Sequence, residues 1–340
     1  MLAFFVSKRK DLEKPIYFKK YIKMRQYTYL TFLILVIAFA YGCRNNSKTD
    51  LTLPDKHDQD IRLSLAQWSF HRALKSGEMD NFQFIEQAAA LGFTAVEYVN
   101  QFFKDQAKDT VFLTKLKEIA TKNNIESLLI MIDDEGNLAD TNTIMRNQAI
   151  ENHKKWIDAA AFLGCHAIRV NLYGTGSREE TASAGVEALG KLATYAAPKG
   201  MTVLVENHGG YSSDASWLAN VIEKVNYPNL GTLPDFDNFC IQYEGGNMWG
   251  TNCIESFDKY TGMQLLMPFA GGVSAKSYNF GEMGYETTID YNRMIEIVYN
   301  SGYSGYINIE YEGNAYPEEK GVLMTKQLLE KCIIEQKARR

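Results

Sequence analysis

The sequence is poor in the residues and motifs that several classes of protein need. Five cysteines in 340 residues are too few for a disulfide framework, and no GxGxxG motif follows the first expected strand, which excludes the usual dinucleotide-binding fold. The longest apolar run, from Tyr27 to Tyr41, is shorter than the ~20 residues of a comfortable membrane span, so a polytopic membrane protein is excluded. The 46% of hydrophobic residues exclude a disordered chain and allow a sizeable core.

Charge is unevenly spread along the chain, although the net value is only −5. Residues 1–42 contain just two acids, Asp11 and Glu13, against eight bases, which are Lys8, Arg9, Lys10, Lys14, Lys19, Lys20, Lys23 and Arg25. The remaining residues, 28 basic and 39 acidic, form an acidic body that repels polyphosphate. We therefore expect no nucleic-acid partner.

The basic segment and the apolar run after it are typical of a secretory signal. The run ends in Ala-Tyr-Gly-Cys, which resembles a bacterial lipobox, so Cys43 is predicted to be lipidated, although Tyr41 is bulkier than that pattern usually allows. We expect a signal peptide over 1–42, with Met24 as an alternative start, and a polar tether over 43–61. The protein is then exported and reaches a membrane through a lipid anchor only, on the periplasmic or cell-surface side. A plain signal anchor with an unmodified Cys43 is the alternative.

The other four cysteines fall into two groups. Cys165 and Cys332 lie in apolar segments and are expected to be buried free thiols. Cys240 and Cys253 lie in one long loop and are the plausible disulfide pair.

A repeated joint organises the chain after the tether. A helix-like apolar stretch, a glycine and a short β-rich run recur in QAAALGFTAVEYV (87–99), DAAAFLGCHAIRVNL (158–172) and VYNSGYSGYINIEY (298–311). Glycine after the last helical residue supplies the left-handed backbone angle that ends a helix. Each segment is therefore predicted to be a helix-to-strand joint.

Strands and helices alternate on either side of these joints. Short, mostly apolar strands are predicted at 63–67, 95–99, 126–132, 167–171, 202–206, 230–235, 272–276 and 306–310. Helices are predicted at 81–91, 109–123, 144–163, 181–197, 214–225, 254–263 (a poorly defined pattern), 290–300 and 317–334. This alternation favours a single-domain (β/α)₈ TIM barrel over 62–340.

Polar side chains stand where the strands end, which is where such barrels place their active sites. Glu206, Asp235 and Glu310 end three different strands and are expected to meet at one mouth. Three carboxylates in one cavity repel one another unless a divalent cation neutralises them. The sequence therefore predicts a metal site.

The strand-end segments resemble those of the xylose-isomerase-like TIM barrels, also called the sugar phosphate isomerase/epimerase superfamily. The resemblance runs from about Leu63 onward, and it is carried by the phrases LAQWSFHRAL, LGFTAVEYV, VENHGG, LPDFDNF, VSAKSYNF and YINIEYEG. It implies a divalent metal, Mn²⁺ first and Mg²⁺, Co²⁺ or Zn²⁺ as alternatives, held by Glu206, Asp235 and Glu310. It also implies that the two glutamates are the acid/base pair.

One strand departs from the family pattern. The seventh strand of the family usually reads His-x-Lys, whereas this chain has Ser274 and Lys276. Serine is a weak metal ligand, so the site uses water, recruits His208 or binds metal loosely. Lys276 remains available to hold an oxyanion or a carbonyl oxygen.

Other residues near the strand ends are candidates for substrate contacts: Gln67, Trp68, His71, Glu97, Arg169, Asn171 and Asn238. Each also has a structural reading. Glu97 could instead pair with Arg169 inside the barrel. Trp68, Tyr98 and Trp249 could be core residues rather than sugar-stacking ones.

The remaining polar residues are expected to have supporting roles. Asp237 and Glu312 are expected to face away from the mouth. His153 and His166 are expected to be structural or solvated, and His57 belongs to the tether.

These residues predict an isomerase or epimerase that moves a proton next to the carbonyl of a sugar. An unphosphorylated sugar is favoured, because the chain carries an export signal and no Gly-rich phosphate loop or basic cluster follows the late strands. A 3-keto-glycoside lyase acting by β-elimination and a non-catalytic sugar-binding lipoprotein are the alternatives. A multi-zinc endonuclease is disfavoured, because the chain has only five histidines. The oligomeric state is left open, with a dimer among the options.

Overall fold

The computed structural model describes residues 59–246, 248 and 251–339. The expected signal peptide, Cys43, His57 and Trp249 lie outside the described residues. None of the helices in the described part of the chain combines the length and the apolar character that crossing a bilayer requires.

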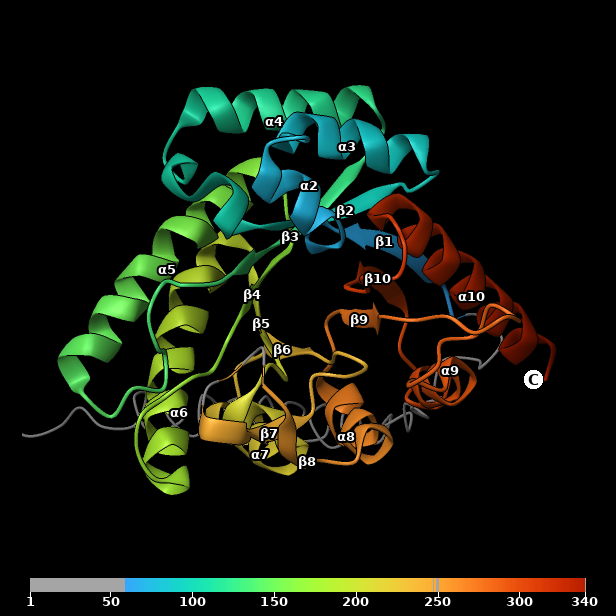
Figure 1. The fold of residues 1–340 in the computed structure, drawn as a ribbon. Coiled ribbons are helices and arrows are strands. Elements are labelled where there is room, and N and C mark those ends of the chain that lie inside the picture. The colour runs from blue at the N-terminus through green and yellow to red at the C-terminus, as the bar shows by residue number, and fades with distance from the viewer. Residues whose placement is uncertain (1–58, 247, 249–250, 340) are drawn as a thin grey trace, which may run out of the picture. The chain divides into compact units, whose positions relative to one another are not determined.

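Eight parallel strands form the central sheet, in the order β6-β5-β4-β3-β2-β1-β10-β9 (Figure 1). Their bounds are β1 Ile61–Ala66, β2 Ala95–Val99, β3 Glu126–Ile132, β4 Ala167–Val170, β5 Thr202–Glu206, β6 Leu230–Leu233, β9 Val273–Ser277 and β10 Gly305–Tyr311. β1 therefore begins inside the range that we expected to be tether. Two bridges close the sheet into a barrel between the first and last strands of this order. They join Thr232 of β6 to Ala270, which precedes β9, and Asp235, which follows β6, to Ser274 of β9. The single-domain (β/α)₈ prediction is confirmed.

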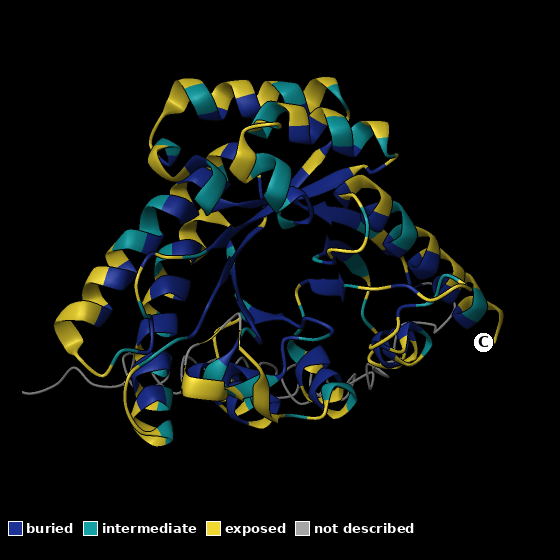
Figure 2. Cartoon of the chain, viewed as in Figure 1, coloured by how far each residue is buried: buried dark blue, intermediate teal, exposed yellow. Residues whose placement is uncertain are grey.

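Helices surround the barrel and cover its outer face (Figures 1 and 2). They are α2 His71–Ser76, α3 Asn81–Ala90, α4 Thr110–Lys122, α5 Thr143–Leu163, α6 Arg178–Ala196, α7 Ala215–Val225, α8 Lys259–Leu266, α9 Tyr291–Asn300 and α10 Glu318–Ala338. Side-chain oxygens cap several of these helices at their first residues, as with Asp80 before α3 and Asn142 before α5. Gly164 ends α5 with a φ of 87°, as the joint pattern predicts.

The hydrophobic residues form two separate layers. The larger one lies between the strands and the helices and includes Trp156, Phe84 and Leu192. The smaller one lies inside the barrel and consists of Ala66, Val99, Leu129, Met131, Ala167, Leu204 and Leu233. Much of the remaining barrel interior is polar, which is unusual for a purely structural core. We therefore expect the functional site inside the barrel.

The segment after β6 differs from the prediction. Residues expected to begin a helix at 254 form the strand β8, Cys253–Ser256, which pairs antiparallel with β7, Cys240–Tyr243. The helical prediction is wrong there, and α8 begins only at Lys259.

The cysteines behave as the sequence predicts. A disulfide joins Cys240 to Cys253 and fastens the two strands of this hairpin. Cys165 and Cys332 are buried free thiols.

Candidate functional site

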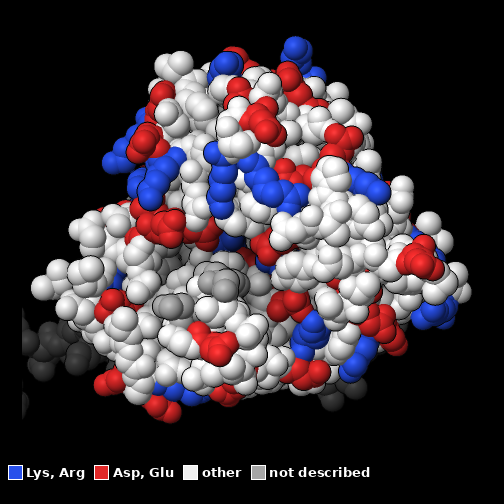
Figure 3. Space-filling view, in the orientation of Figure 1, with Lys and Arg blue, Asp and Glu red and all other residues white. Residues whose placement is uncertain are grey.

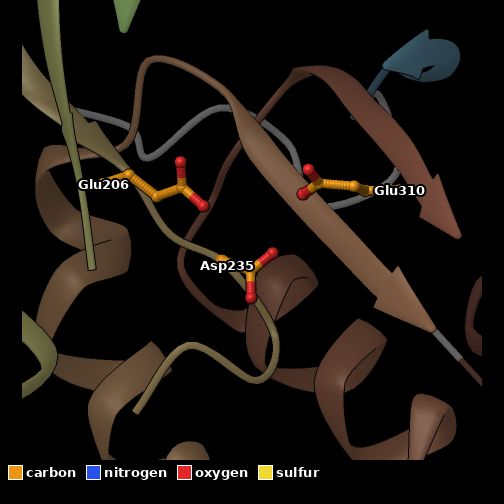
Figure 4. A group of neighbouring side chains, drawn as sticks. All are labelled: Glu206, Asp235 and Glu310. Carbon is orange, nitrogen blue, oxygen red and sulfur yellow. The ribbon is translucent and has the colours of Figure 1, made fainter. Parts of the chain in front are cut away.

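Three carboxylates from three strand ends meet in the barrel mouth. Glu206 is the last residue of β5, Asp235 follows β6, and Glu310 lies near the end of β10. One oxygen of each lies within 4.8 Å of the others, and all three residues are buried. Figure 4 shows the three side chains pointing toward one another. The structure therefore brings the predicted metal ligands together.

Backbone and amide groups hold this cluster in place. Asp235 Oδ1 accepts hydrogen bonds from the backbone N–H groups of Asp237 and Asn238, at 2.9 Å each. Asn238 Nδ2 in turn donates to Glu206 Oε1 at 2.9 Å. The second oxygen, Asp235 Oδ2, is buried without a hydrogen-bond partner in the described residues. A buried carboxylate oxygen without a partner is costly, and a bound cation would satisfy it.

The residue at position 274 contacts a carboxylate of the cluster. Ser274 Oγ donates a hydrogen bond to Glu310 Oε2 at 3.0 Å. Lys276 Nζ lies 3.5 Å from the same oxygen and 3.3 Å from Glu312 Oε1. His208 lines the mouth, with Nδ1 2.6 Å from the Tyr173 hydroxyl. The group of possible ligand atoms within reach of one another contains the three carboxylates and not His208.

Arg169 joins the cluster to a residue that the sequence did not single out. Its Nε lies 2.8 Å from Glu206 Oε2, and its Nη1 lies 2.7 Å from Asp133 Oδ1. The ion pair considered between Glu97 and Arg169 is not formed, since among the described residues Arg169 pairs with Glu206 and Asp133.

Glu97 instead lies within the barrel, below the mouth. Its carboxyl accepts hydrogen bonds from Ser64 Oγ at 3.0 Å and from Asn308 Nδ2 at 2.8 Å. It lines a separate cavity of about 250 Å³, whose other lining residues include Arg62 and Glu126 at the starts of their strands. Glu97 therefore faces away from the predicted substrate position. Burial raises its pKa to about 8.

Burial and mutual repulsion make the carboxylate cluster reluctant to ionise fully. Burial raises the pKa of Glu206 well above its usual range, and the Glu310 and Asp235 carboxylates add to this. Burial raises the pKa of Asp235 to about 7. Two of the three groups can therefore hold a proton near neutral pH when no cation is present.

Two neighbouring basic groups differ in their charge. Burial alone would lower the pKa of Lys276, but the Glu310 and Glu312 carboxylates raise it well above its usual value, so the ammonium stays charged. Burial lowers the pKa of His208 well below its usual value, and this imidazole is neutral. The mouth therefore contains a fixed cation and a neutral imidazole.

A pocket of about 570 Å³ opens above the cluster, in the hollow of the face shown in Figure 3. It is lined by seven of the predicted site residues: Trp68, His71, Arg169, Asn171, His208, Lys276 and Glu310. Acidic side chains outnumber basic ones along its wall, because Asp133, Asp134, Glu135 and Glu312 also line it.

Two residues that were predicted to contact substrate form hydrogen bonds within the protein instead of lining this pocket. The Gln67 amide donates from Nε2 to Asn81 Oδ1 at 2.8 Å and accepts from Val99 N at 2.9 Å. Asn238 is occupied by Glu206, as described above. Tyr98 is a buried core residue whose hydroxyl lies 2.9 Å from Ser127 Oγ.

Sequence reasoning missed part of the pocket wall. Asp133 and the next two acids directly follow the strand predicted at 126–132, so their position was the available signal. The expectation that Glu312 faces away is wrong, because it lines the pocket and contacts Lys276. Glu312 directly follows β10, and alternate residues of an extended chain share a face, so its spacing of two from Glu310 was the available signal. Asp237 forms an ion pair with Lys259 and does not line the pocket.

Comparison with known proteins assigns this chain to a family. Residues 85–332 match the family model described as xylose isomerase-like TIM barrel. No curated protein matches the sequence at the significance required.

Several solved structures share the fold at low sequence identity. The 3-keto-D-glucoside 4-epimerase YcjR from E. coli, in its apo form, is 14% identical, with a TM-score of 0.63 over 80% of this chain and 100% of that one. An L-ribulose 3-epimerase is 13% identical, with a TM-score of 0.65 over 82% and 96%. The IolI protein with a bound zinc atom is 15% identical, with a TM-score of 0.61 over 81% and 99%.

Proposed function

Because the chain belongs to the xylose isomerase-like TIM barrel family, we propose that it is a metal-assisted isomerase or epimerase acting on an unphosphorylated sugar outside the cytoplasm. The observation that carries this proposal is the cluster of Glu206, Asp235 and Glu310 at the strand ends. Similarity in fold to several sugar epimerases supports it. The reaction class is transfer of a proton at the carbon next to a carbonyl.

The donor set suits a divalent cation. Glu206, Asp235 and Glu310 offer only carboxylate oxygens, which Mn²⁺ and Mg²⁺ accept readily, and Asp235 Oδ2 is buried without a hydrogen bond from the described residues. Such a cation would polarise a sugar carbonyl and the adjacent hydroxyl and acidify the C–H between them.

The two glutamates are placed to move the proton. Glu206 and Glu310 approach the centre of the mouth from β5 and β10, with Asp235 beside them (Figure 4). A substrate carbon held between them can lose a proton to one carboxylate and regain it from the other. The raised pKa of Glu206 suits this role near neutral pH. Lys276, kept charged by its neighbours, is placed to hold an oxyanion.

The pocket wall favours a neutral substrate. The acids Asp133, Asp134, Glu135 and Glu312 line it, and two of the three cations present, Arg169 and Lys276, already contact carboxylates. A phosphate or carboxylate group on the substrate would be repelled. This supports an unphosphorylated sugar or sugar derivative.

A glycoside lyase is the second candidate. The same proton abstraction ends in β-elimination when the neighbouring carbon bears a leaving group. The pocket of about 570 Å³ has room for a second ring or an aglycone beyond the sugar that reaches the carboxylates. Similarity in fold to a 3-keto-D-glucoside 4-epimerase makes an oxidised glycoside a natural candidate substrate.

Export through a signal peptide and lipidation at Cys43 belong to the same proposal. The Cys240–Cys253 disulfide supports them, because disulfides persist in oxidising compartments and are rare in the cytosol. Loss of a fatty-acid label in Cys43→Ala, against a labelled wild type, tests the anchor. A wild type without label would contradict it.

Hydrogen exchange with solvent tests the proposed chemistry. The mature protein with Mn²⁺ is incubated in D₂O with 3-keto-glucosides and free ketoses, and the C–H signals are followed by proton NMR. We expect deuterium next to one carbonyl, and a loss of rate of about 10²-fold or more in Glu206→Gln and Glu310→Gln. Asp237→Asn, which changes a carboxylate outside the pocket, is the matched control.

Other outcomes of this experiment would favour a different function or contradict the site assignment. Release of an aglycone would favour the lyase. Sugar-dependent thermal stabilisation without exchange across the panel would favour a binding protein. Exchange that both glutamate variants retain would contradict the site assignment.

A further inference from the structure

A buried chain of polar groups runs from the pocket wall into the carboxylate cluster. Asp133 Oδ1 accepts from Arg169 Nη1 and from Asn171 Nδ2, at 2.7 Å each. Arg169 Nη1 also lies 3.1 Å from Asn171 Oδ1, and Arg169 Nε lies 2.8 Å from Glu206 Oε2. One guanidinium is thus held between two carboxylates, and one of these belongs to the cation site.

Burial keeps the Arg169 side chain in this position. Its side chain is 4% exposed, so it cannot turn into solvent, and a guanidinium does not lose its proton in proteins. It therefore brings a permanent positive charge to the Glu206 carboxylate. The same carboxylate is one of the three that could hold a cation.

We propose that Asp133 is a positioning residue that, through Arg169, sets the affinity of Glu206 for the divalent cation. The inference rests on the proposed function, because it concerns the same cation site. Asp133 attracts one end of the guanidinium toward β3 and offsets part of its positive charge. The negative charge of Glu206 therefore remains available to bind the cation. Without Asp133 the full charge of Arg169 falls on Glu206, and arginine and cation compete for one carboxylate.

The same contacts give Asp133 a second effect. Because its Oδ1 accepts from Asn171 Nδ2, it fixes the orientation of an amide that lines the pocket. A purely structural role for Asp133 would predict lower stability when it is changed, with no specific effect on cation affinity. Cation affinity therefore distinguishes the two interpretations.

The neighbouring residue provides a matched control. Asp134 is the same residue type in the same loop and lines the same pocket, but its Oδ2 accepts a hydrogen bond from Gln101 Nε2 at 3.0 Å, away from the cluster. Asp133→Asn and Asp134→Asn remove the same charge, but only Asp133 contacts Arg169 and Asn171.

The test is isothermal titration of the metal-free proteins with MnCl₂, with circular dichroism to confirm folding. We expect Asp133→Asn to weaken Mn²⁺ binding by about 10–100-fold and Asp134→Asn to change it by less than about threefold. The double variant Asp133→Asn/Arg169→Met removes both charges, so its affinity should return most of the way to the wild-type value. It also keeps the test available if Asp133→Asn alone does not fold.

Two results would overturn the inference. One is a folded Asp133→Asn that binds Mn²⁺ as the wild type does while Glu206→Gln does not, which leaves the cation site intact. The other is a double variant that binds as weakly as Asp133→Asn. A wild type that does not bind Mn²⁺ would overturn both this inference and the proposed cation site.

Discussion

Among single residues, Ser274 has the clearest consequence for the cation site. Its hydroxyl donates to Glu310 Oε2 and leaves the three carboxylates as an all-oxygen donor set. Imidazole favours Zn²⁺, whereas carboxylate sets suit Mn²⁺ and Mg²⁺. We therefore expect Ser274→His to shift the ratio of Zn²⁺ to Mn²⁺ affinity upward by at least about tenfold, or ~1.4 kcal/mol.

Competition dialysis of the two ions measures this ratio. Ser274→Ala is the control, because it removes the hydroxyl without adding a ligand, and its ratio should stay near that of the wild type. The fully buried site is small, so a lower melting temperature is expected for the histidine variant. An unchanged ratio in a folded Ser274→His protein that binds both ions would contradict the proposed ligand set.

Glu97 provides a prediction about pH. Burial raises the pKa of Glu97 to about 8. At pH values between the ordinary pKa of a glutamate and about 8, the folded protein therefore holds a proton that the unfolded chain has lost. Its contribution to stability is therefore present at low pH and is lost as the pH rises toward about 8. Glu97→Gln cannot titrate, so its free energy of unfolding should fall less than that of the wild type between pH 5.5 and 8.5. Urea denaturation at the two pH values checks this, and equal falls would count against the prediction.

Among the elements, the β7–β8 hairpin is held together by a covalent link. The Cys240–Cys253 disulfide closes a short loop, and a loop of about 15 residues corresponds to ~3 kcal/mol in the chain-entropy model. We expect reduction to increase proteolysis between these cysteines and to lower the melting temperature.

Thiol labelling of the folded protein checks that link. Cys165 and Cys332 are buried, and burial raises their thiol pKa values, so they should not react. Iodoacetamide should add to Cys240 and Cys253 after mild reduction and to neither before it. Labelling of these two without reduction would contradict the disulfide.

The elements also show which features the sequence could predict. The joint at Gly164 was predictable because the helical period and the glycine after it are local signals. The cluster of Glu206, Asp235 and Glu310 followed from strand-end positions once the barrel was assumed. The hairpin had no comparable signal, since Cys253–Ser256 is short and wholly exposed, and only the cysteine pair indicated it.

Asp133 shows why the rest could not be predicted. Two adjacent aspartates after a strand resemble an ordinary solvated turn, and nothing local shows that one reaches Arg169 and Asn171. That contact is set by the register between β3 and β4, which places Met131 beside Arg169. Roles that depend on pairing between strands therefore need the structure.

At the scale of the whole molecule, the cation site and the stability of the barrel are coupled. The raised pKa values of Asp235, about 7, and of Glu206 mean that the metal-free folded protein holds protons that the unfolded chain releases. Stability should therefore fall as the pH rises through neutrality. Saturating Mn²⁺ should reduce this fall, because a cation stabilises the ionised carboxylates, and binding should release protons.

Melting curves with and without Mn²⁺ at pH 5.5 and 8 measure the coupling. We expect the stabilisation by Mn²⁺ to be larger at pH 8 than at pH 5.5. Asp235→Asn should lose most of that difference. A stabilisation that is larger at the acidic pH would contradict the coupling.

The most direct test of the cation site is anomalous diffraction from crystals of the protein grown with MnCl₂. We expect one strong peak between the carboxylates of Glu206, Asp235 and Glu310, and its loss in Asp235→Asn crystals. A fully occupied manganese elsewhere, with the three carboxylates left uncoordinated, would contradict it.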